Sequence, residues 1–338
     1  MIEINQVSKL YSESKVLSLD NVTLNIPKGS IVGLIGVNGA GKSTLLRIAA
    51  GIYRQDKGTV LIDGEPVYEN NDAKSKIAYI SDEQFYRRGT TMKKMANVHA
   101  SLRDNFSIKK FCSLAEEFGL DINRSLSGFS KGMRRQNDII TALSCESEYI
   151  LCDETFDGLD PITREKTKSI FIKNVADSGA TILLSSHNLQ ELEDICDRIV
   201  LLDKGKLVLS AELDDLKDTV NKYQLMFENN KFGFDMLESL SPFALAQSGQ
   251  IVSFIAAGEE KEIEKRARAI AEENGNGLVY IEALPLSLDE IFAYKLNTAG
   301  LSELSVLTET PKKTEEAKKS ENTRQSDCCE KAGDAENE

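Results

Sequence analysis

The sequence lacks any apolar run approaching the roughly 18 residues that a membrane-spanning helix needs. Residues 1–6 also lack the basic and then apolar layout of a secretory signal peptide, so we expect a soluble cytoplasmic protein. Basic residues are in the minority, with 41 Lys and Arg against 54 Asp and Glu and a net charge of −13. Because a broad nucleic-acid-binding face needs clustered Lys and Arg, we expect no nucleic-acid partner, although a local basic patch stays open.

The six cysteines lack the paired spacing that metal ligands show. Cys145, Cys152 and Cys196 lie within apolar or helical segments, and Cys328 and Cys329 adjoin each other near the C-terminus. We therefore interpret the cysteines as reduced and structural.

The length of 338 residues and the 41% hydrophobic content allow one large core and a smaller second unit. We assign residues 1–215 to the first and residues 216–297 to a small α+β extension, for which a structural or dimer-supporting role is favoured over a ligand sensor. The polar tail 298–338 has too few apolar residues to offset its ordering entropy and is predicted to be disordered. Within the extension we expect strands at 223–227, 251–255 and 277–281 and helices at 262–273 and 288–296.

A glycine-rich segment at residues 36–43 reads Gly-Val-Asn-Gly-Ala-Gly-Lys-Ser. It follows the apolar run 30–35, typical of a buried parallel strand, and precedes a predicted helix at 43–50. This order of strand, glycine loop and helix is that of a P-loop, in which glycines let successive N–H groups face phosphate oxygens. The candidate ATP-binding residues are Gly36, Val37, Asn38, Gly39, Ala40, Gly41, Lys42, Ser43 and Thr44.

Three of these residues have side chains suited to a nucleotide with magnesium. Lys42 is predicted to reach the β- and γ-phosphates, and Ser43 to place its hydroxyl on Mg²⁺. Thr44 is a further candidate donor to phosphate. The sequence therefore predicts ATP and Mg²⁺ as the ligands of this loop.

Acidic and imidazole side chains follow two other predicted strands. The apolar run 149–152 ends in Asp153 and Glu154, and the run 180–186 ends at His187, one of only two histidines. Open α/β sheets place ligands at such strand ends. We expect Asp153 to hold Mg²⁺ through water and Glu154 to orient or deprotonate the attacking water. We expect His187 to contact the γ-phosphate, with a satisfied core or capping histidine as the alternative.

Between these segments, residues 126–136 read Leu-Ser-Gly-Phe-Ser-Lys-Gly-Met-Arg-Arg-Gln. Here the chain resembles the nucleotide-binding subunit of ATP-binding cassette (ABC) transporters, over roughly residues 1–215. Phe129 to Met133 match the family signature in an exporter-like variant. A second Leu-Ser-Gly begins at Leu126, but Ser130 lies 23 residues before Asp153, as in the family, whereas Ser127 lies 26 before it.

The resemblance implies roles for further residues. Ser130 and Gly132 would close the ATP site of a second subunit, Asp160 would communicate across the dimer, and Tyr11 would stack on adenine, unless it is a half-buried strand-end tyrosine. Glu154 matches the catalytic carboxylate and His187 the switch histidine. The coupling-loop glutamine, which would approach the metal and the permease contact, falls at Asp82 or Gln84, or the segment is a plain surface turn. Departures from the family pattern are Thr155, Lys131 and Met133.

The resemblance also implies the fold and the function. We expect an α/β P-loop ATPase core with a mixed sheet and helices, an inserted helical subdomain at about 85–145, and the small α+β extension. The chain would be an ATPase subunit, peripheral on the inner face of the cell membrane through a separate permease, forming a homodimer or a heterodimer and favouring export. The alternatives are a soluble ATPase acting on ribosomes or DNA, and a regulatory ATP-binding module.

Overall fold

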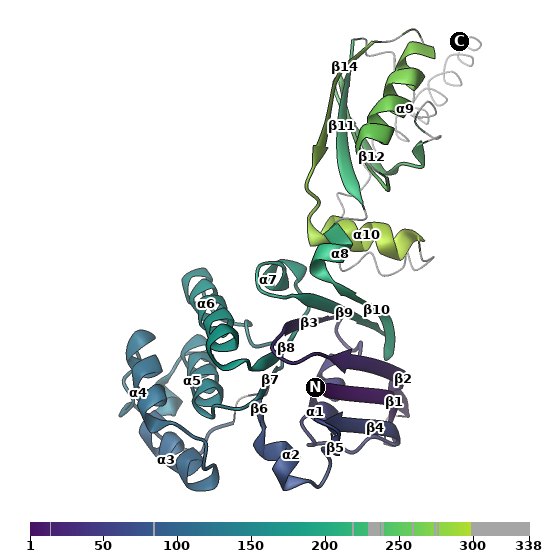
Figure 1. The fold of residues 1–338 in the computed structure, drawn as a ribbon. Coiled ribbons are helices and arrows are strands. Elements are labelled where there is room, and N and C mark those ends of the chain that lie inside the picture. The colour runs from purple at the N-terminus through teal and green to yellow at the C-terminus, as the bar shows by residue number, and fades with distance from the viewer. Residues whose placement is uncertain are drawn as a thin grey trace, which may run out of the picture.

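The computed structural model describes residues 1–13, 15–83, 85–217, 220–228, 237, 240–258, 260–273, 275 and 277–298 (Figure 1). The predictions for Gln84 and for the tail beyond residue 298 lie outside these residues. The described chain is a mixed α/β structure with three sheets. No helix in this part of the chain combines the length and apolar character required to cross a membrane.

A six-stranded sheet forms the centre of the molecule, and five of its strands are parallel. The three strands in its middle are buried along their whole length, as strands covered on both faces must be. These are the apolar runs expected to be strands, and the prediction is confirmed. The order is β10 (Lys206–Glu212), β9 (Arg198–Asp203), β3 (Ile31–Ile35), β8 (Thr181–Ser186), β7 (Tyr149–Cys152) and β6 (Ile77–Ile80), with β10 antiparallel to β9.

An antiparallel sheet packs beside this centre (Figure 1). Its long strands alternate buried and more exposed residues, because one face meets the core and the other meets solvent. Its apolar face, helix α1 (Lys42–Ala49) and one face of the central sheet share a single hydrophobic core. The strand order is β2 (Val16–Ile26), β1 (Ile2–Tyr11), β4 (Lys57–Ile62) and β5 (Glu65–Pro66).

Helices cover the other face of the central sheet and extend beyond β6, on the left of Figure 1. Side-chain N-caps begin most of them, and Pro161 stands at the first position of α6. The helix-rich segment expected after residue 85 contains α3, α4 and α5. The helices and the 3₁₀ turn η1 are α2 (Asn71–Ser75), α3 (Met92–Leu102), α4 (Ile108–Glu117), η1 (Leu126–Gly128), α5 (Lys131–Ser144), α6 (Pro161–Ser178) and α7 (Leu189–Glu193).

The C-terminal part of the described chain forms a third, antiparallel sheet with its own core, at the top of Figure 1. Helix α9 covers one face of this sheet, and α10 returns to pack against α7. The expected α+β extension is confirmed. Its elements are α8 (Leu213–Lys217), β11 (Asn221–Phe227), β12 (Phe243–Ser248), β13 (Ile251–Ala256), α9 (Glu260–Glu273), β14 (Leu278–Leu284) and α10 (Leu288–Thr298).

One carboxylate links the antiparallel sheet to the central sheet. Asp63, in the turn after β4, lies 2.8 Å from Lys28 Nζ and 3.1 Å from Lys76 Nζ. It also accepts hydrogen bonds from the Tyr149 hydroxyl at 2.6 Å and from the α-amino group of Met1 at 2.5 Å. Burial alone would raise the pKa of Asp63, but the hydrogen bonds from Lys28, Met1, Tyr149 and Lys76 hold it well below its usual range.

We expect Asp63→Asn to lower the free energy of unfolding at pH 7 by about 1–3 kcal/mol, because hydrogen bonds to the charged carboxylate are lost. A depressed pKa stabilises the fold above the unfolded value of about 4, and this contribution disappears as pH falls through the folded pKa. The difference in the free energy of unfolding between wild type and variant, measured by urea unfolding, should therefore shrink toward pH 3. A difference that grows on acidification would contradict this.

Candidate active site

The glycine loop lies between β3 and α1, as the sequence predicts. Gly41 precedes α1 with φ at 106°, a conformation that disfavours side chains, and a Cβ there would lie 2.5 Å from Ser18 O. A Cβ on Gly36 would lie 2.5 Å from Leu202 O. At Gly39, where φ is 85°, nothing lies within 4 Å of the Cβ position, so the outer side of the loop is open. The loop therefore fits a phosphate cradle at a helix start.

Lys42 is the cation of this loop, and its side chain is only 5% exposed. Its Nζ donates to Gly36 O at 2.7 Å and lies 3.2 Å from Glu154 Oε1. A buried ammonium group needs such partners. The residue predicted to hold phosphate and the residue predicted to act on water are thus in direct contact.

Asp153, at the end of β7, is fully buried and is surrounded by hydroxyl groups. Its Oδ1 accepts from Ser43 Oγ and from Ser185 Oγ, each at 2.9 Å, and its Oδ2 accepts from the Tyr79 hydroxyl at 3.2 Å. Burial, together with the charge of Asp153, raises the pKa of Tyr79 to about 12, so the hydroxyl stays a donor. These contacts compensate the buried carboxylate.

Sequence reasoning missed Tyr79 and Ser185. Both belong to strands that flank β7 in the central sheet, namely β6 and β8. The signal in the sequence was a hydroxyl-bearing residue near the carboxyl end of an apolar strand. Only the strand order shows that Tyr79 and Ser185 both neighbour Asp153.

The oxygen groups around Asp153 suit a magnesium ion. Mg²⁺ prefers oxygen ligands and is commonly held by one or two carboxylates together with substrate phosphates. Asp153 and the Ser43 hydroxyl, adjoining a phosphate cradle, supply such oxygens. The residues present therefore fit the predicted metal.

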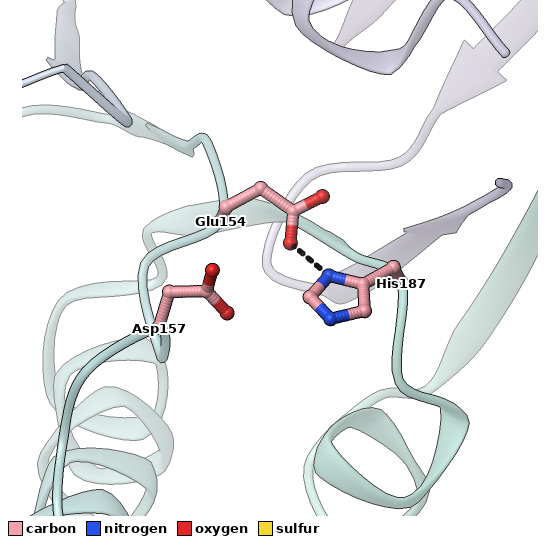
Figure 2. A group of neighbouring side chains, drawn as sticks. All are labelled: Glu154, Asp157 and His187. Atoms are coloured by element: carbon pink, nitrogen blue, oxygen red, sulfur yellow. Dashed lines mark hydrogen bonds and ion pairs between the residues drawn. The ribbon is translucent and has the colours of Figure 1, made fainter. Parts of the chain in front are cut away.

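Glu154 and His187 form a hydrogen-bonded pair beside this site, shown in Figure 2. The distance from His187 Nδ1 to Glu154 Oε2 is 2.9 Å, and the Asp157 carboxylate lies on the same side of the imidazole. One possible metal-ligand atom from each of these three side chains lies within 4.8 Å of the other two. The hydrogen bond to Glu154 raises the pKa of His187 above its ordinary value. Glu154 itself has φ at 46°, and its N–H donates to Ser185 Oγ at 3.0 Å.

The predicted signature lies at a helix start. Ser130 is the exposed N-cap of α5 and accepts from the Met133 N–H at 3.2 Å, whereas Ser127 lies within η1. A Cβ on Gly132 would lie 2.8 Å from Gly158 O, so glycine is required there. Within one chain, no hydrogen bond or ion pair of the described residues joins Ser130 or Gly132 to the glycine loop.

Asp160 and Tyr11 lie at two further places. Asp160 caps α6 by accepting from the Thr163 N–H at 3.1 Å, and hydrogen bonds from Thr163 lower the pKa of this carboxyl. Tyr11 lies at the end of β1, with its hydroxyl 3.2 Å from Thr44 Oγ1. The ring of Tyr53 stands edge-on to Tyr11 at 6.3 Å, so Tyr11 borders the start of α1.

Asp82 is held by a residue that sequence reasoning missed. The buried Arg135 of α5 lies 3.1 Å from Asp82 Oδ1 and donates to Ser81 O at 2.6 Å and to Asp82 O at 3.1 Å. The Asp82 carboxylate thus faces the signature helix, and none of its hydrogen bonds among the described residues reaches Asp153. Nothing in the sequence near Asp82 indicates this partner.

Comparisons with known proteins agree with this geometry. A sequence model of the ABC transporter family matches residues 19–157. The chain is 28% identical to the ABC transporter ATP-binding protein YtrB of Bacillus subtilis, over 87% of this chain and 98% of that protein. It is 33% identical to the lipopolysaccharide export system ATP-binding protein LptB of Haemophilus influenzae, over 62% of this chain and 90% of that protein. It is 32% identical to the methionine import ATP-binding protein MetN of Haemophilus ducreyi, over 64% of this chain and 66% of that protein.

Solved structures share the fold. The structure of an ATP binding subunit of an ABC transporter has a TM-score of 0.59 and 29% identity, covering 64% of this chain and 92% of that one. A dimeric ATP-binding cassette in a post-hydrolysis state, bound to ADP and Pi, has a TM-score of 0.57 and 24% identity, covering 63% of this chain and 99% of that one.

The two histidines should titrate on opposite sides of about 6.5, the ordinary value. Glu154 raises the pKa of His187, while burial and the nearby Arg103 lower that of His99. The stabilising His187–Glu154 pair is therefore fully formed below about pH 6.5 and is lost as pH rises through the folded pKa of His187. Imidazole NMR across pH 5–9 checks this, and Glu154→Gln should lower the His187 midpoint only. Coincident midpoints in wild type would contradict the assignment.

Proposed function

The chain belongs to the ABC transporter family as an ATP-binding subunit and is an ATPase, and on that premise we propose that residues around Asp153 hydrolyse ATP to drive a separate membrane permease. The observation that supports this most directly is the convergence of three elements. Lys42 and Ser43 at the start of α1 contact Glu154 and Asp153 at the end of β7, and His187 at the end of β8 contacts Glu154.

Lys42 changes its partner when ATP binds. Its ammonium now lies beside Glu154, and a triphosphate in the glycine loop would attract the same charge more strongly. When Lys42 exchanges the Glu154 carboxylate for phosphate, Glu154 becomes free to orient or deprotonate water. Thr44 adds a phosphate donor, and Tyr11 at the edge of the site stacks on adenine.

Ser43 and Asp153 hold Mg²⁺, which when bound neutralises phosphate charge. Glu154 orients the attacking water, and His187, fixed through Nδ1, offers its second ring nitrogen to the γ-phosphate. Positioning and charge stabilisation account for most of the rate enhancement in phosphoryl transfer.

The second half of the site comes from another subunit. The α5 start with Ser130 is exposed and offers free N–H groups to an anion, as helix starts do. Gly132 keeps the backbone approach open, and Asp160, also exposed, communicates between subunits. A homodimer is our primary proposal, with a heterodimer of related ATPases as the alternative.

The permease docks where the helices adjoin β6. A cavity of about 230 Å³ opens there, lined by residues such as Ile80, Glu83, Tyr86, Met95 and Arg103. Phe85 also lines this cavity and is 93% exposed, so its ring is available to a partner. The subunit is then peripheral on the inner face of the membrane. Asp82, and Gln84 outside the described residues, belong to this coupling segment.

We also propose the division of labour along the chain. Residues 1–215 form the ATPase unit with its helical subdomain at about 85–145, and residues 216–297 form a structural extension. The direction of transport is proposed to be export, on the wording of the signature.

Replacing Glu154 by Gln should reduce ATP turnover by about 100-fold or more, because a carboxylate that activates water is lost. ATP binding should persist, so the variant should also elute as an ATP-dependent dimer in size-exclusion chromatography. Glu165→Gln, on the exposed surface of α6, is the matched control. Equal turnover in Glu154→Gln and wild type would refute the hydrolytic assignment.

Phe85→Ser should lower the fraction of full-length chain recovered with cell membranes several-fold, because the docking edge loses its aromatic side chain. ATP hydrolysis by the purified chain should stay unchanged. Val279→Ser, which alters an exposed residue of β14, is the control. Unaltered membrane recovery of Phe85→Ser would oppose docking there, and recovery with ribosomes instead would favour the rival function.

A further inference from the structure

The backbone around His187 is fixed by the short helix that follows it. Ser186 Oγ accepts from the Asn188 N–H at 2.9 Å and donates to Glu191 Oε2 at 2.7 Å. Asn188 caps α7 by accepting from the Gln190 N–H at 3.0 Å. Both neighbours of His187 are therefore hydrogen-bonded within this turn, and Glu191 is the side chain that anchors it.

Glu191 is almost completely buried, and each carboxylate oxygen has a partner. Opposite the bond to Ser186, its Oε1 lies 3.4 Å from Arg164 in the first turn of α6. The Arg164 N–H donates to Asp160 O at 2.9 Å in the same helical turn. A continuous set of contacts thus runs from Asp160 through Arg164 and Glu191 to the residue before His187.

The rest of α7 is held independently of Glu191. Leu189 and Leu192 are buried in the core that also contains Ile291 and Phe292 of α10. Removal of the Glu191 charge therefore leaves α7 packed, and its effect falls on the turn around His187.

We propose that Glu191 is a positioning residue for ATP hydrolysis, holding the turn around His187 so that Nδ1 stays on Glu154 and the second ring nitrogen faces the nucleotide. The inference rests on the proposed roles of His187 and Glu154. It adds that movement of the α6 start, where Asp160 lies, is transmitted to His187 through the ion pair of Arg164 with the buried Glu191. Figure 2 shows the imidazole of His187 beside Glu154.

Charge supports the same arrangement. The hydrogen bond to Glu154 is the main cause of the raised pKa of His187, and the charges of Glu154, Asp157 and Glu191 add to it, against the effect of burial. Glu191 thus holds the turn that carries His187, and its negative charge favours the protonated form of the ring.

The test compares full-length Glu191→Gln, Ser186→Ala, the double variant and the control Glu165→Gln. The Glu165 carboxylate is 65% exposed and pairs with Lys168 among the described residues. We expect Glu191→Gln to lower kcat for ATP by about 10-fold, because small misplacements of reacting groups cost that much or more. KM for ATP should stay within about twofold, since the glycine loop is untouched. The double variant should lose less than the sum of the two single losses, because both substitutions weaken the Ser186–Glu191 hydrogen bond.

Imidazole NMR provides a readout that general destabilisation would not change. The His187 resonance should move in Glu191→Gln and in Ser186→Ala, while the His99 resonance stays in place. Should Glu191→Gln fail to fold, Ser186→Ala tests the same contact from the other side.

Wild-type kcat in folded Glu191→Gln, or losses that add in the double variant, would overturn the inference. His187→Ala separates the two proposals. If His187→Ala is inactive and Glu191→Gln is fully active, only the role of Glu191 fails. If His187→Ala itself turns over ATP at the wild-type rate, the proposed role of His187 fails and the inference fails with it.

Discussion

The structure depends on a carboxylate buried at the end of a central strand. An isolated ionised group costs several kcal/mol when it is taken out of water, so Asp153 can stay buried only if its neighbours supply donors. Those donors come from α1, β6 and β8, through Ser43, Tyr79 and Ser185. The requirement to satisfy one charge therefore fixes the positions of the glycine loop and of the strand ends that carry Glu154 and His187.

Two connections lead away from this centre toward the parts that would move. Arg135 joins the loop after β6 to the helix that Ser130 caps, so the coupling segment and the signature share one buried guanidinium. Glu191 joins the turn around His187 to the start of α6. In each contact one charged partner is buried, Arg135 in the first and Glu191 in the second, and leaving a buried charge unpaired is costly. The ATP site and its surroundings can thus respond as one unit.

Much of this could be predicted from sequence, where the signal is local. The glycine loop, the fully apolar strands and the α+β extension all follow from residue spacing, and the choice of Ser130 over Ser127 agrees with the N-cap of α5. Tyr79, Ser185, Arg135 and Glu191 could not be identified, because their partners lie in other elements and are brought near only by sheet order and helix packing. The orientation of Asp82 toward Arg135 is of the same kind. The functional roles of the site residues stay predictions.

The central claim is that one composite pocket holds a triphosphate and a metal between two copies of the chain. The most direct measurement is a crystal structure of the full chain with a non-hydrolysable ATP analogue and Mn²⁺ in place of Mg²⁺. We predict the triphosphate along residues 36–43 with Lys42 on its phosphates, an anomalous metal peak beside Ser43 and Asp153, and Ser130 of a second copy at the γ-phosphate. A triphosphate bound away from Lys42, or a closed dimer in which Ser130 faces solvent, would contradict the account.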